Sequence, residues 1–340
     1  MNKVRIAVDV MGGDEEPQVV LDGIDAALAA DADLEVLAVG PAELVEPFAS
    51  SRDRVEALVA PDVITMEDDP IQAVMRKRKS SIVLACRAVK KGQAAGFFSA
   101  GATGAMTAAA TAYVTPFKYM TDEGEKRPIR PCIVSAIPNR KGAFTVFCDL
   151  GANPDVDPED IVRFAQMGAT YARIVCGIAN PRVGLLSNGT EDTKGSHFTK
   201  ECFPLMQKKV KGFAGNCEGT DFTSGNFDVV VCDGFAGNVA LKATEGAAKL
   251  ILHELKSTLL ASTKGKIAAL LVKNDLKAIQ QKLSGDAYGG AVLLGLQGVV
   301  LIGHGATSVE AVKNGTLAAA RAVRSNLVEM LAASMDNIVR

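Results

Sequence analysis

The stretch FTVFCDLGANPDVDPEDIV, Phe144–Val162, combines a strand signal, a loop and a helix start. The apolar run Phe144–Cys148 is typical of a buried strand, and the glycine-containing loop DLGAN follows it. Asp157 and Pro158 then mark a helix start, because aspartate is a preferred N-cap residue and proline fits the first helical position. The stretch therefore predicts one strand–loop–helix unit.

Four other stretches repeat this order of signals. In each one an apolar run passes into glycines and polar residues before a helical pattern begins. They are VDVMGGDEEP (Val8–Pro17), GFFSAGATGA (Gly96–Ala105), RVGLLSNGTEDTKGS (Arg182–Ser196) and DVVVCDGFAGNVALK (Asp228–Lys242). Such strand–helix alternation predicts an α/β fold with βαβ units on a mostly parallel sheet.

The pattern of the whole chain favours one domain over residues 1–340 with helical elaborations near the C-terminus. Apolar residues at helical spacing, such as Val20, Ile24, Ala27 and Leu28, lie between many of the apolar runs. The C-terminal third after Asn238 has a largely helical pattern. Strands are expected over residues 4–8, 34–39, 95–98, 133–137, 143–148, 183–186 and 229–232.

The composition excludes several classes of protein. The formal net charge of −2 argues against a general nucleic-acid binder. The seven cysteines are too widely spaced for CxxC metal sites, so we expect reduced thiols in a cytosolic protein and no metal centre. The uncharged stretches 93–117 and 287–309 are rich in small residues, and we expect core and loops there rather than bilayer spans. The first residues do not have the pattern of a signal peptide.

The five junctions predict a ligand site, because the carboxyl ends of parallel strands share one edge of a sheet. Glycine backbones and helix N-termini suit a phosphate-like anion. Neither GxxxxGK[ST] nor GxGxxG after a strand is present, so an ordinary nucleotide site is not indicated. The junction acids would repel a bare anion, and we expect them to orient the backbone or cap helices. They are Asp9, Asp14, Asp149 and Asp233.

Two side chains are candidates for the chemistry itself. Lys194, in the loop TEDTKGS, is a credible ligand for an anion or for transition-state charge, and a solvated loop lysine is the alternative. His304 lies between glycines, where its ring can reach the edge of a site. His253 is expected on a helix face, and the role of His197 is open. No GxSxG motif is present, so a covalent acyl-enzyme is not indicated.

Six segments in one order carry a family resemblance along nearly the whole chain. They are IAVDVMGGDEEP, SAGATGA, DLGANPDVDPEDIVRFAQMG, PRVGLLSNGTEDTKG, EGTDFTSGNFDVVVCDGFAGNVALKATEG and YGGAVLLGLQGVVLIGHGA. Together they closely resemble the bacterial acyl-carrier-protein:phosphate acyltransferases of phospholipid synthesis, the PlsX family. The resemblance implies a three-layer α/β/α sandwich similar to isopropylmalate dehydrogenases and phosphotransacetylases, and a homodimer.

The resemblance also implies a reaction and its setting. Orthophosphate attacks the thioester of a fatty acyl carrier protein, no cofactor takes part, and the acyl phosphate feeds a glycerol-3-phosphate acyltransferase. Members of the family act in the cytoplasm with peripheral membrane contact. The positions of the loops in this sequence suggest a catalytic set of Lys194, His304, Asn238 and Asn153, of which the two asparagines would place the thioester. The expected phosphate and substrate contacts are Asp9, Gly12, Gly13, Asp14, Ser99, Gly101, Thr103, Gly104, Asp149, Asn188, Glu191 and Asp233.

Three positions depart from the family pattern. Ala102 stands where SAGNTGA usually has asparagine, and Gly289 stands where YNGA has asparagine. Ser187 and Asn188 stand in LLSNG where the family usually has LLNIG, so the amide is displaced by one position. These departures affect loops of the expected site without changing the family resemblance.

Two surface segments suggest partners. The basic run Arg76–Lys79 is typical of a solvated helix face or of a docking patch for an acidic carrier protein. The stretch Leu252–Leu283, within a helical segment of about 245–285, mixes apolar residues with lysines. This pattern fits a dimer contact or an interfacial helix on a membrane, and we expect a dimer contact with a membrane-touching tip.

Three other functions compete with the expected one. A short-chain phosphate acyltransferase that uses acyl-CoA would share the fold and the anion chemistry. A non-catalytic regulator that binds acyl carrier protein is suggested by the three departures. An NAD-dependent decarboxylating dehydrogenase is disfavoured, because no dinucleotide motif is present.

Overall fold

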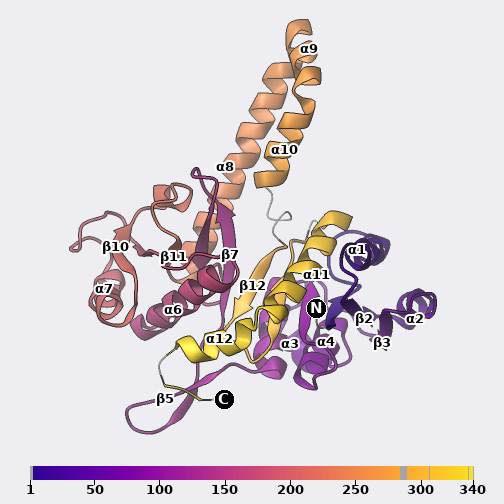
Figure 1. Ribbon diagram of the computed structural model, residues 1–340, viewed down its shortest axis with the longest axis horizontal. Helices are drawn as coiled ribbons and strands as arrows, with labels where there is room; N and C mark the ends of the chain where they lie inside the picture. Colours follow the sequence, from indigo (N-terminus) through magenta and orange to yellow (C-terminus); the bar gives the residue numbers. More distant parts are fainter. Residues whose placement is uncertain (1–2, 284–288, 306, 336, 340) are drawn as a thin grey trace.

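The computed structural model describes residues 3–283, 289–305, 307–335 and 337–339. One large sheet with helices on both faces forms its centre (Figure 1). Its eleven strands lie in the order β10 (Phe213–Cys217), β9 (Val183–Leu186), β11 (Val229–Val231), β8 (Phe144–Cys148), β7 (Cys132–Pro138), β12 (Ala291–Leu294), β13 (Val299–Ile302), β4 (Gly96–Ser99), β1 (Val4–Asp9), β2 (Leu34–Gly40) and β3 (Val55–Val59). A second, three-stranded sheet contains β14 (Ile338–Val339), β5 (Lys118–Met120) and β6 (Lys126–Pro128).

The helices form two layers, one on each face of the large sheet. One layer contains α1 (Pro17–Ala30), α2 (Ala42–Ser50), α6 (Pro158–Ile174), α7 (His197–Lys209), α11 (Val309–Arg324) and α12 (Leu327–Ser334). The other contains α3 (Pro70–Arg76), α4 (Ser81–Lys90), α5 (Thr103–Ala109), a π-helical turn (Ala110–Val114) and a 3₁₀ turn (Gly219–Phe222).

Alternating side chains of the strands create the two cores that hold these layers. In β1, Ile6 and Val8 belong to the core under α1 and α11, while Ala7 belongs to the core under α4. In β11, Val230 likewise faces the opposite side from its two neighbours. Strands buried on both faces are near-continuously apolar, which is why these runs were recognisable. The three-layer α/β/α architecture is therefore confirmed.

All seven expected strands are present, with bounds that differ by at most one residue at each end. The helix start at Asp157 and Pro158 is also confirmed, and the Asp160 carboxylate accepts a hydrogen bond from the Asp157 N–H at 3.3 Å. All seven cysteines are free thiols, and all except Cys176 are buried.

The largely helical pattern expected after Asn238 missed two strands. β12 and β13 both lie in the uncharged stretch 287–309 and occupy the middle of the sheet. Each is a run of four apolar residues, and the periodicity of so short a run does not distinguish a buried strand from a buried helix.

The expectation that all five loops share one edge is wrong. Seven strand pairings of the large sheet are parallel, which confirms a mostly parallel sheet, but three are antiparallel. The antiparallel pairs are β8 with β7, β7 with β12 and β12 with β13. As a result, β1 and β4 run in the opposite direction to β8, β9 and β11.

The register nevertheless brings both sets of strand ends to the same level. Pairing across the sheet places Cys148, the last residue of β8, in one row with Phe98 of β4 and Val8 of β1. We call β13, β4, β1, β2 and β3 the first half of the sheet, and β10, β9, β11 and β8 the second half. The two halves are displaced along the strand direction, so their carboxyl ends approach the middle of the molecule from opposite sides.

A helical arm projects from the second half (Figure 1). It contains α8 (Gly234–Leu260), α9 (Thr263–Leu271) and α10 (Lys273–Leu283). The segment expected over 245–285 coincides with this arm, except that residues 284 and 285 lie outside the described residues. In the described part of the chain, no helix combines the length and apolarity that crossing a membrane requires.

Candidate active site

A buried acid organises the loops of the first half. The Asp9 carboxylate accepts hydrogen bonds from the Met11 N–H at 3.0 Å and from the Ser99 hydroxyl at 2.8 Å. The Ser99 oxygen in turn accepts from the Gly101 N–H at 2.9 Å. Burial raises the pKa of the Asp9 carboxyl, and hydrogen bonds from Ser81 and Ser99 oppose that shift. Asp9, Ser99 and Gly101 thus form one network that joins the loops after β1 and β4.

The glycines after β1 allow these loops to pack closely. A Cβ atom on Gly12 would lie 2.6 Å from the Ser99 hydroxyl oxygen and 2.9 Å from the Ala100 backbone nitrogen. Gly13 has φ +124° and lies beside Thr307, and the Asp14 N–H donates to the Gly305 carbonyl at 2.8 Å. A side chain at either glycine would therefore strain or separate the loops.

A second buried acid organises the DLGAN loop. The Asp149 carboxylate accepts from the backbone N–H groups of Ile133 (2.8 Å), Ala152 (3.2 Å) and Asn153 (2.7 Å). It also accepts from the Asn153 side-chain amide at 2.9 Å. Burial raises the pKa of Asp149, and the four N–H donors oppose the shift. The Asn153 amide donates its other hydrogen to the Pro131 carbonyl at 2.7 Å, so both of its N–H bonds are used inside the protein.

The start of α8 packs directly on that loop. The Asp233 carboxylate caps the helix by accepting from the Ala236 N–H at 2.8 Å, which is the capping role expected for a junction acid. The Gly234 N–H donates to the Asn153 carbonyl at 2.8 Å. A Cβ atom on Gly151 would lie 3.4 Å from the Asn238 Cβ. The DLGAN loop after β8 and the junction between β11 and α8 are therefore packed together as one unit.

A cavity of about 280 Å³ lies where the two halves meet. The first half contributes Thr103 at the start of α5 and His304 after β13, and the second half contributes Leu150 and Asn238. One wall is formed by β7 and is largely apolar, and another is formed by α8, where Leu241 and Ala248 lie among polar and charged side chains. Their lining residues are Ile133, Ser135, Ala136, Ile137 and Pro138 of β7, and Leu241, Lys242, Thr244, Glu245 and Ala248 of α8. The cavity is thus apolar along β7, and the rest of its lining includes hydroxyl, amide, imidazole and charged groups.

The expected site residues divide into groups. Thr103, Asn238 and His304 line this cavity, whereas Asn188 and Asp233 line a second cavity of about 520 Å³ next to α7. Lys194 and Glu191 are exposed on the loop after β9 and line neither cavity. The roles of all these residues stay predictions.

The three departures have local structural consequences. Ala102 precedes α5 and provides no side-chain cap for that helix. The Asn188 side-chain oxygen accepts from the Gly195 N–H at 2.9 Å and thereby holds the loop after β9. Gly289 has φ +87°, and a Cβ there would lie 2.7 Å from the Asn314 carbonyl oxygen, so glycine fits this position better than asparagine.

The sequence reasoning missed the walls of the cavity. The β7 segment was recognised as a strand, but nothing in its residues indicates that it is antiparallel and borders a site. In α8 a partial signal exists, because Leu241 and Ala248 lie at the helical spacing of one face.

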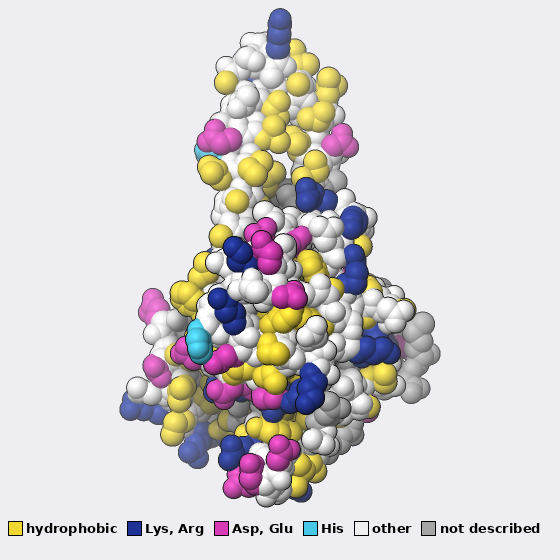
Figure 2. Space-filling view, turned by 90° about the vertical axis from the view of Figure 1, so that its left-hand side faces the viewer, with side chains coloured by type: hydrophobic (Ala, Val, Ile, Leu, Met, Phe, Trp, Pro, Cys, Tyr) yellow, Lys and Arg dark blue, Asp and Glu magenta, His cyan; other side chains and the backbone are white. Residues whose placement is uncertain are grey.

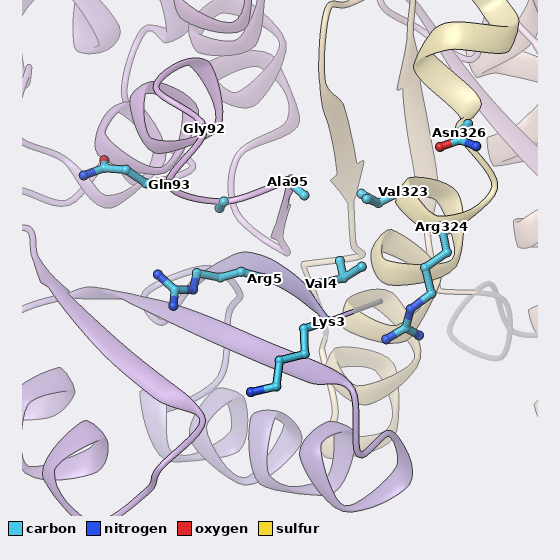
Figure 3. A pocket seen from close by; sticks show the side chains of 10 residues that line it. Lys3, Val4, Arg5, Gly92, Gln93, Ala95, Val323, Arg324 and Asn326 are labelled. Atoms are coloured by element: carbon cyan, nitrogen blue, oxygen red, sulfur yellow. The ribbon is translucent and has the colours of Figure 1, made fainter. Parts of the chain in front are cut away.

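A larger cavity, of about 650 Å³, lies in the first half at the amino-terminal ends of β1 and β4 (Figure 3). Lys3, Arg5 and Arg324 line it, but all three are paired with acids: Lys3 and Arg5 with Glu35, and Arg324 with Asp31. Its cations are therefore already engaged within the protein. Among the described residues, no group of three or more His, Cys, Asp or Glu side chains is arranged to hold a metal ion.

Known structures share this fold. The phosphotransacetylase of Streptococcus pyogenes matches with a TM-score of 0.59 and 16% identity, covering 95% of this chain and 94% of its own. The EutD phosphotransacetylase of Staphylococcus aureus matches with a TM-score of 0.56 and 18% identity, covering 94% of each chain. At such identities the likeness concerns the fold alone. It confirms the expected similarity to phosphotransacetylases, while the similarity to isopropylmalate dehydrogenases stays a prediction.

Sequence relatives are much nearer. A phosphate acyltransferase of Desulforudis audaxviator is 42% identical over 335 residues, which are 98% of this chain and 97% of the relative. One of Staphylococcus epidermidis is 40% identical over 329 residues, or 96% and 98% of the two chains. A family model described as fatty acid synthesis protein matches residues 4–330. The chain therefore belongs to this fatty acid synthesis protein family, that of the phosphate acyltransferases.

Proposed function

We propose that the protein transfers a fatty acyl group from acyl carrier protein to inorganic phosphate and releases an acyl phosphate for phosphatidic acid synthesis. The observation that carries this proposal is the cavity between the halves. Its β7 wall, together with Leu241 and Ala248 of α8, suits an alkyl chain, and its rim carries the polar groups of loops from both halves. Identity of about 40% to phosphate acyltransferases over nearly the whole chain supports the same reaction.

In the proposed reaction a phosphate oxygen attacks the thioester carbonyl carbon. A C–O bond forms, the carbonyl electrons move onto oxygen, and their return breaks the C–S bond and expels the pantetheine thiolate, which takes up a proton. Phosphate is partly dianionic at neutral pH, so the protein's main tasks are to position the anion and to stabilise the oxyanion. Positioning contributes about 7–11 kcal/mol in well-aligned cases, and losing one oxyanion donor costs about 3–4 kcal/mol.

The loop geometry revises which N–H groups are available for these tasks. The Gly12 N–H donates to the Asp9 carbonyl at 3.3 Å and the Gly101 N–H to Ser99, so both are used within the loops. The N–H groups of Gly13 and of Gly104, in the first turn of α5, have no partner among the described residues. We propose that these two N–H groups, together with Lys194, bind phosphate and the oxyanion.

Two further roles follow from side-chain positions. His304 is exposed and lines the cavity. We propose that its side chain donates the proton that the leaving thiolate takes up. Asn238 also lines the cavity and is proposed to place the thioester. Asn153 was expected to share that role, but both N–H bonds of its amide are committed to Asp149 and Pro131. We therefore propose that Asn153 acts by holding the DLGAN loop.

One assay tests the proposed reaction. The protein is incubated with phosphate and palmitoyl carrier protein, and acyl phosphate is trapped with hydroxylamine. Hydroxamate that depends on phosphate and on enzyme is expected. Turnover of acyl-CoA with none of the carrier thioester would replace the proposal with the acyl-CoA enzyme, and binding of acyl carrier protein without any turnover would replace it with the regulator. The relatives at about 40% identity favour neither of these alternatives.

The arm supports a second part of the proposal, on assembly and location. Many of its large apolar side chains are exposed, and Figure 2 shows apolar groups along it. On the shaft these are Leu250, Ile251 and Leu255, and at the α9 end Ile267, Leu270 and Leu271. We propose that the shaft forms a homodimer contact and that the α9 tip touches the membrane, where an acyltransferase for glycerol-3-phosphate would take up the product. The protein would then be cytoplasmic and peripherally bound.

A further inference from the structure

A mixed apolar and basic patch lies beside the first-half loops. Met66, Ile71 and Met75 expose 52%, 66% and 63% of their surfaces, although large apolar side chains are usually buried. Arg76 and Lys79 follow on the same segment and are exposed as well. We call these five residues the α3 patch.

The cations of the α3 patch are free to meet a partner. Within the described ranges, no acid lies at ion-pair distance from Arg76 or Lys79. By contrast, Lys77 in the same run is tied to Asp68 at 2.7 Å and to the Val63 carbonyl at 2.9 Å. The basic run is therefore divided into one lysine that holds the local fold and flanking cations that face solvent.

Two contacts join the patch to the candidate site. Pro70 begins α3 and packs against Gly104, where a Cβ would lie 2.8 Å from its ring. The Met66 methyl group lies beside Gly305, 3.2 Å from where a Cβ would stand. Gly104 and Gly305 are chain neighbours of Thr103 and His304, which line the cavity. The patch is thus directly outside the end of the cavity where the proposed reaction takes place.

We infer that the α3 patch is the docking surface for the acidic carrier protein that delivers the acyl group. This inference rests on the proposed function. An acidic helical protein complements unpaired arginine and lysine, and exposed methionine side chains adapt to an apolar partner surface. A carrier bound there can pass its pantetheine arm between Thr103 and His304, so that the thioester reaches the cavity while the carrier stays outside.

The test compares two thioesters of the same acyl chain, one on carrier protein and one on pantetheine. The variant Arg76→Glu/Lys79→Glu is expected to raise KM for the carrier substrate about tenfold, because rim charges govern encounter. Its kcat/KM for acyl-pantetheine should be unchanged. The matched control is Lys208→Glu/Lys211→Glu, an equal charge change on exposed lysines near the end of α7, and it should behave as the wild type. Ile71→Ser/Met75→Ser, which does not change the charge, should likewise raise KM for the carrier substrate and leave kcat/KM for acyl-pantetheine unchanged.

Three outcomes would overturn the inference: an unchanged KM for the carrier substrate in both patch variants, equal effects of patch and control charge reversals, or an equal loss with both thioesters. Failure of the proposed function is distinguishable, because the wild type would then make no acyl phosphate from either thioester. In that case anisotropy of labelled carrier protein decides, with weaker binding to the patch variants supporting the inference and unchanged binding overturning it.

Discussion

Gly237, in the first turns of α8, lies so close to the backbone carbonyl of Asp149 that a Cβ atom at position 237 would overlap the carbonyl oxygen. This contact fixes the arm-bearing helix on the DLGAN loop. Gly237→Ala is therefore expected to destabilise the protein by about 1–3 kcal/mol, the usual range for overpacking, and to lower activity by displacing Asn238. Urea unfolding and the hydroxamate assay measure the two effects.

Gly246→Ala provides the matched control in the same helix. A Cβ at position 246 would meet nothing within 4 Å. Alanine exceeds glycine in helix propensity by about 1 kcal/mol, so this substitution should stabilise the protein or leave it unchanged. Equal effects of the two substitutions would contradict the close contact of Gly237 with Asp149.

The Asp31–Arg324 pair predicts a loss of stability in acid. Arg324 donates two hydrogen bonds to the Asp31 carboxylate, at 2.5 and 3.2 Å, and lowers the pKa of that carboxyl below its usual 3.8. Asp31→Asn should cost about 2 kcal/mol at pH 7. Because the folded-state pKa is lowered, the contribution is complete above 3.8 and is lost as the pH falls through the folded value. Urea midpoints of the two proteins should therefore converge in acid, while Asp53→Asn, at an exposed position, should leave the urea midpoint unchanged at pH 7.

The buried Asp9 carboxyl predicts the opposite dependence of stability on pH. Burial raises its folded-state pKa above 3.8, so the folded protein binds the proton more tightly than the unfolded chain. Relative to Asp9→Asn, the wild type should lose stability as the pH rises from 3.8 through the raised value. Unfolding free energies measured for both proteins across this window test the sign, and a difference that grows in favour of the wild type with rising pH would refute it.

Cavity width predicts acyl-chain preference. Ala248 lines the cavity and is half-buried, whereas Ala247, its neighbour in α8, is exposed and does not line it. Ala248→Phe should fill space along the α8 wall and reduce kcat/KM for long acyl chains about tenfold, the order of effect expected when a pocket loses room for a methylene or two. Short acyl chains should be affected less, and Ala247→Phe should change neither. A flat loss across a series of chain lengths would place the acyl chain elsewhere.

The tip of the arm predicts membrane binding. Leu270 and Leu271 expose 75% and 78% of their surfaces. Leu270→Glu/Leu271→Glu should abolish flotation with anionic liposomes and leave the hydroxamate assay in solution unchanged, because the tip is remote from the cavity. Sedimentation of the same variant should still report a dimer, whereas Leu250→Glu/Ile251→Glu on the shaft should weaken dimerisation. Flotation of the tip variant at the wild-type level would exclude this contact.

The sequence by itself determined the fold class, the family and much of the loop chemistry. Phe144–Cys148, Val183–Leu186 and the other buried strands are recognisable because side chains buried on both faces must all be apolar. Asp157 and Asp233 were identifiable as residues at helix starts, since capping depends on neighbours in the chain.

Only the tertiary structure decided how these pieces meet. The direction of β7 and β12 depends on pairing between distant segments, so the separation of the loops into two opposed sets was not visible in the sequence. The same holds for the commitment of Asn153 to Asp149 and Pro131, and for the contact of Gly237 with the Asp149 carbonyl. Local residue patterns specify elements and turns, whereas strand order, register and close backbone approach arise from packing between residues far apart in the chain.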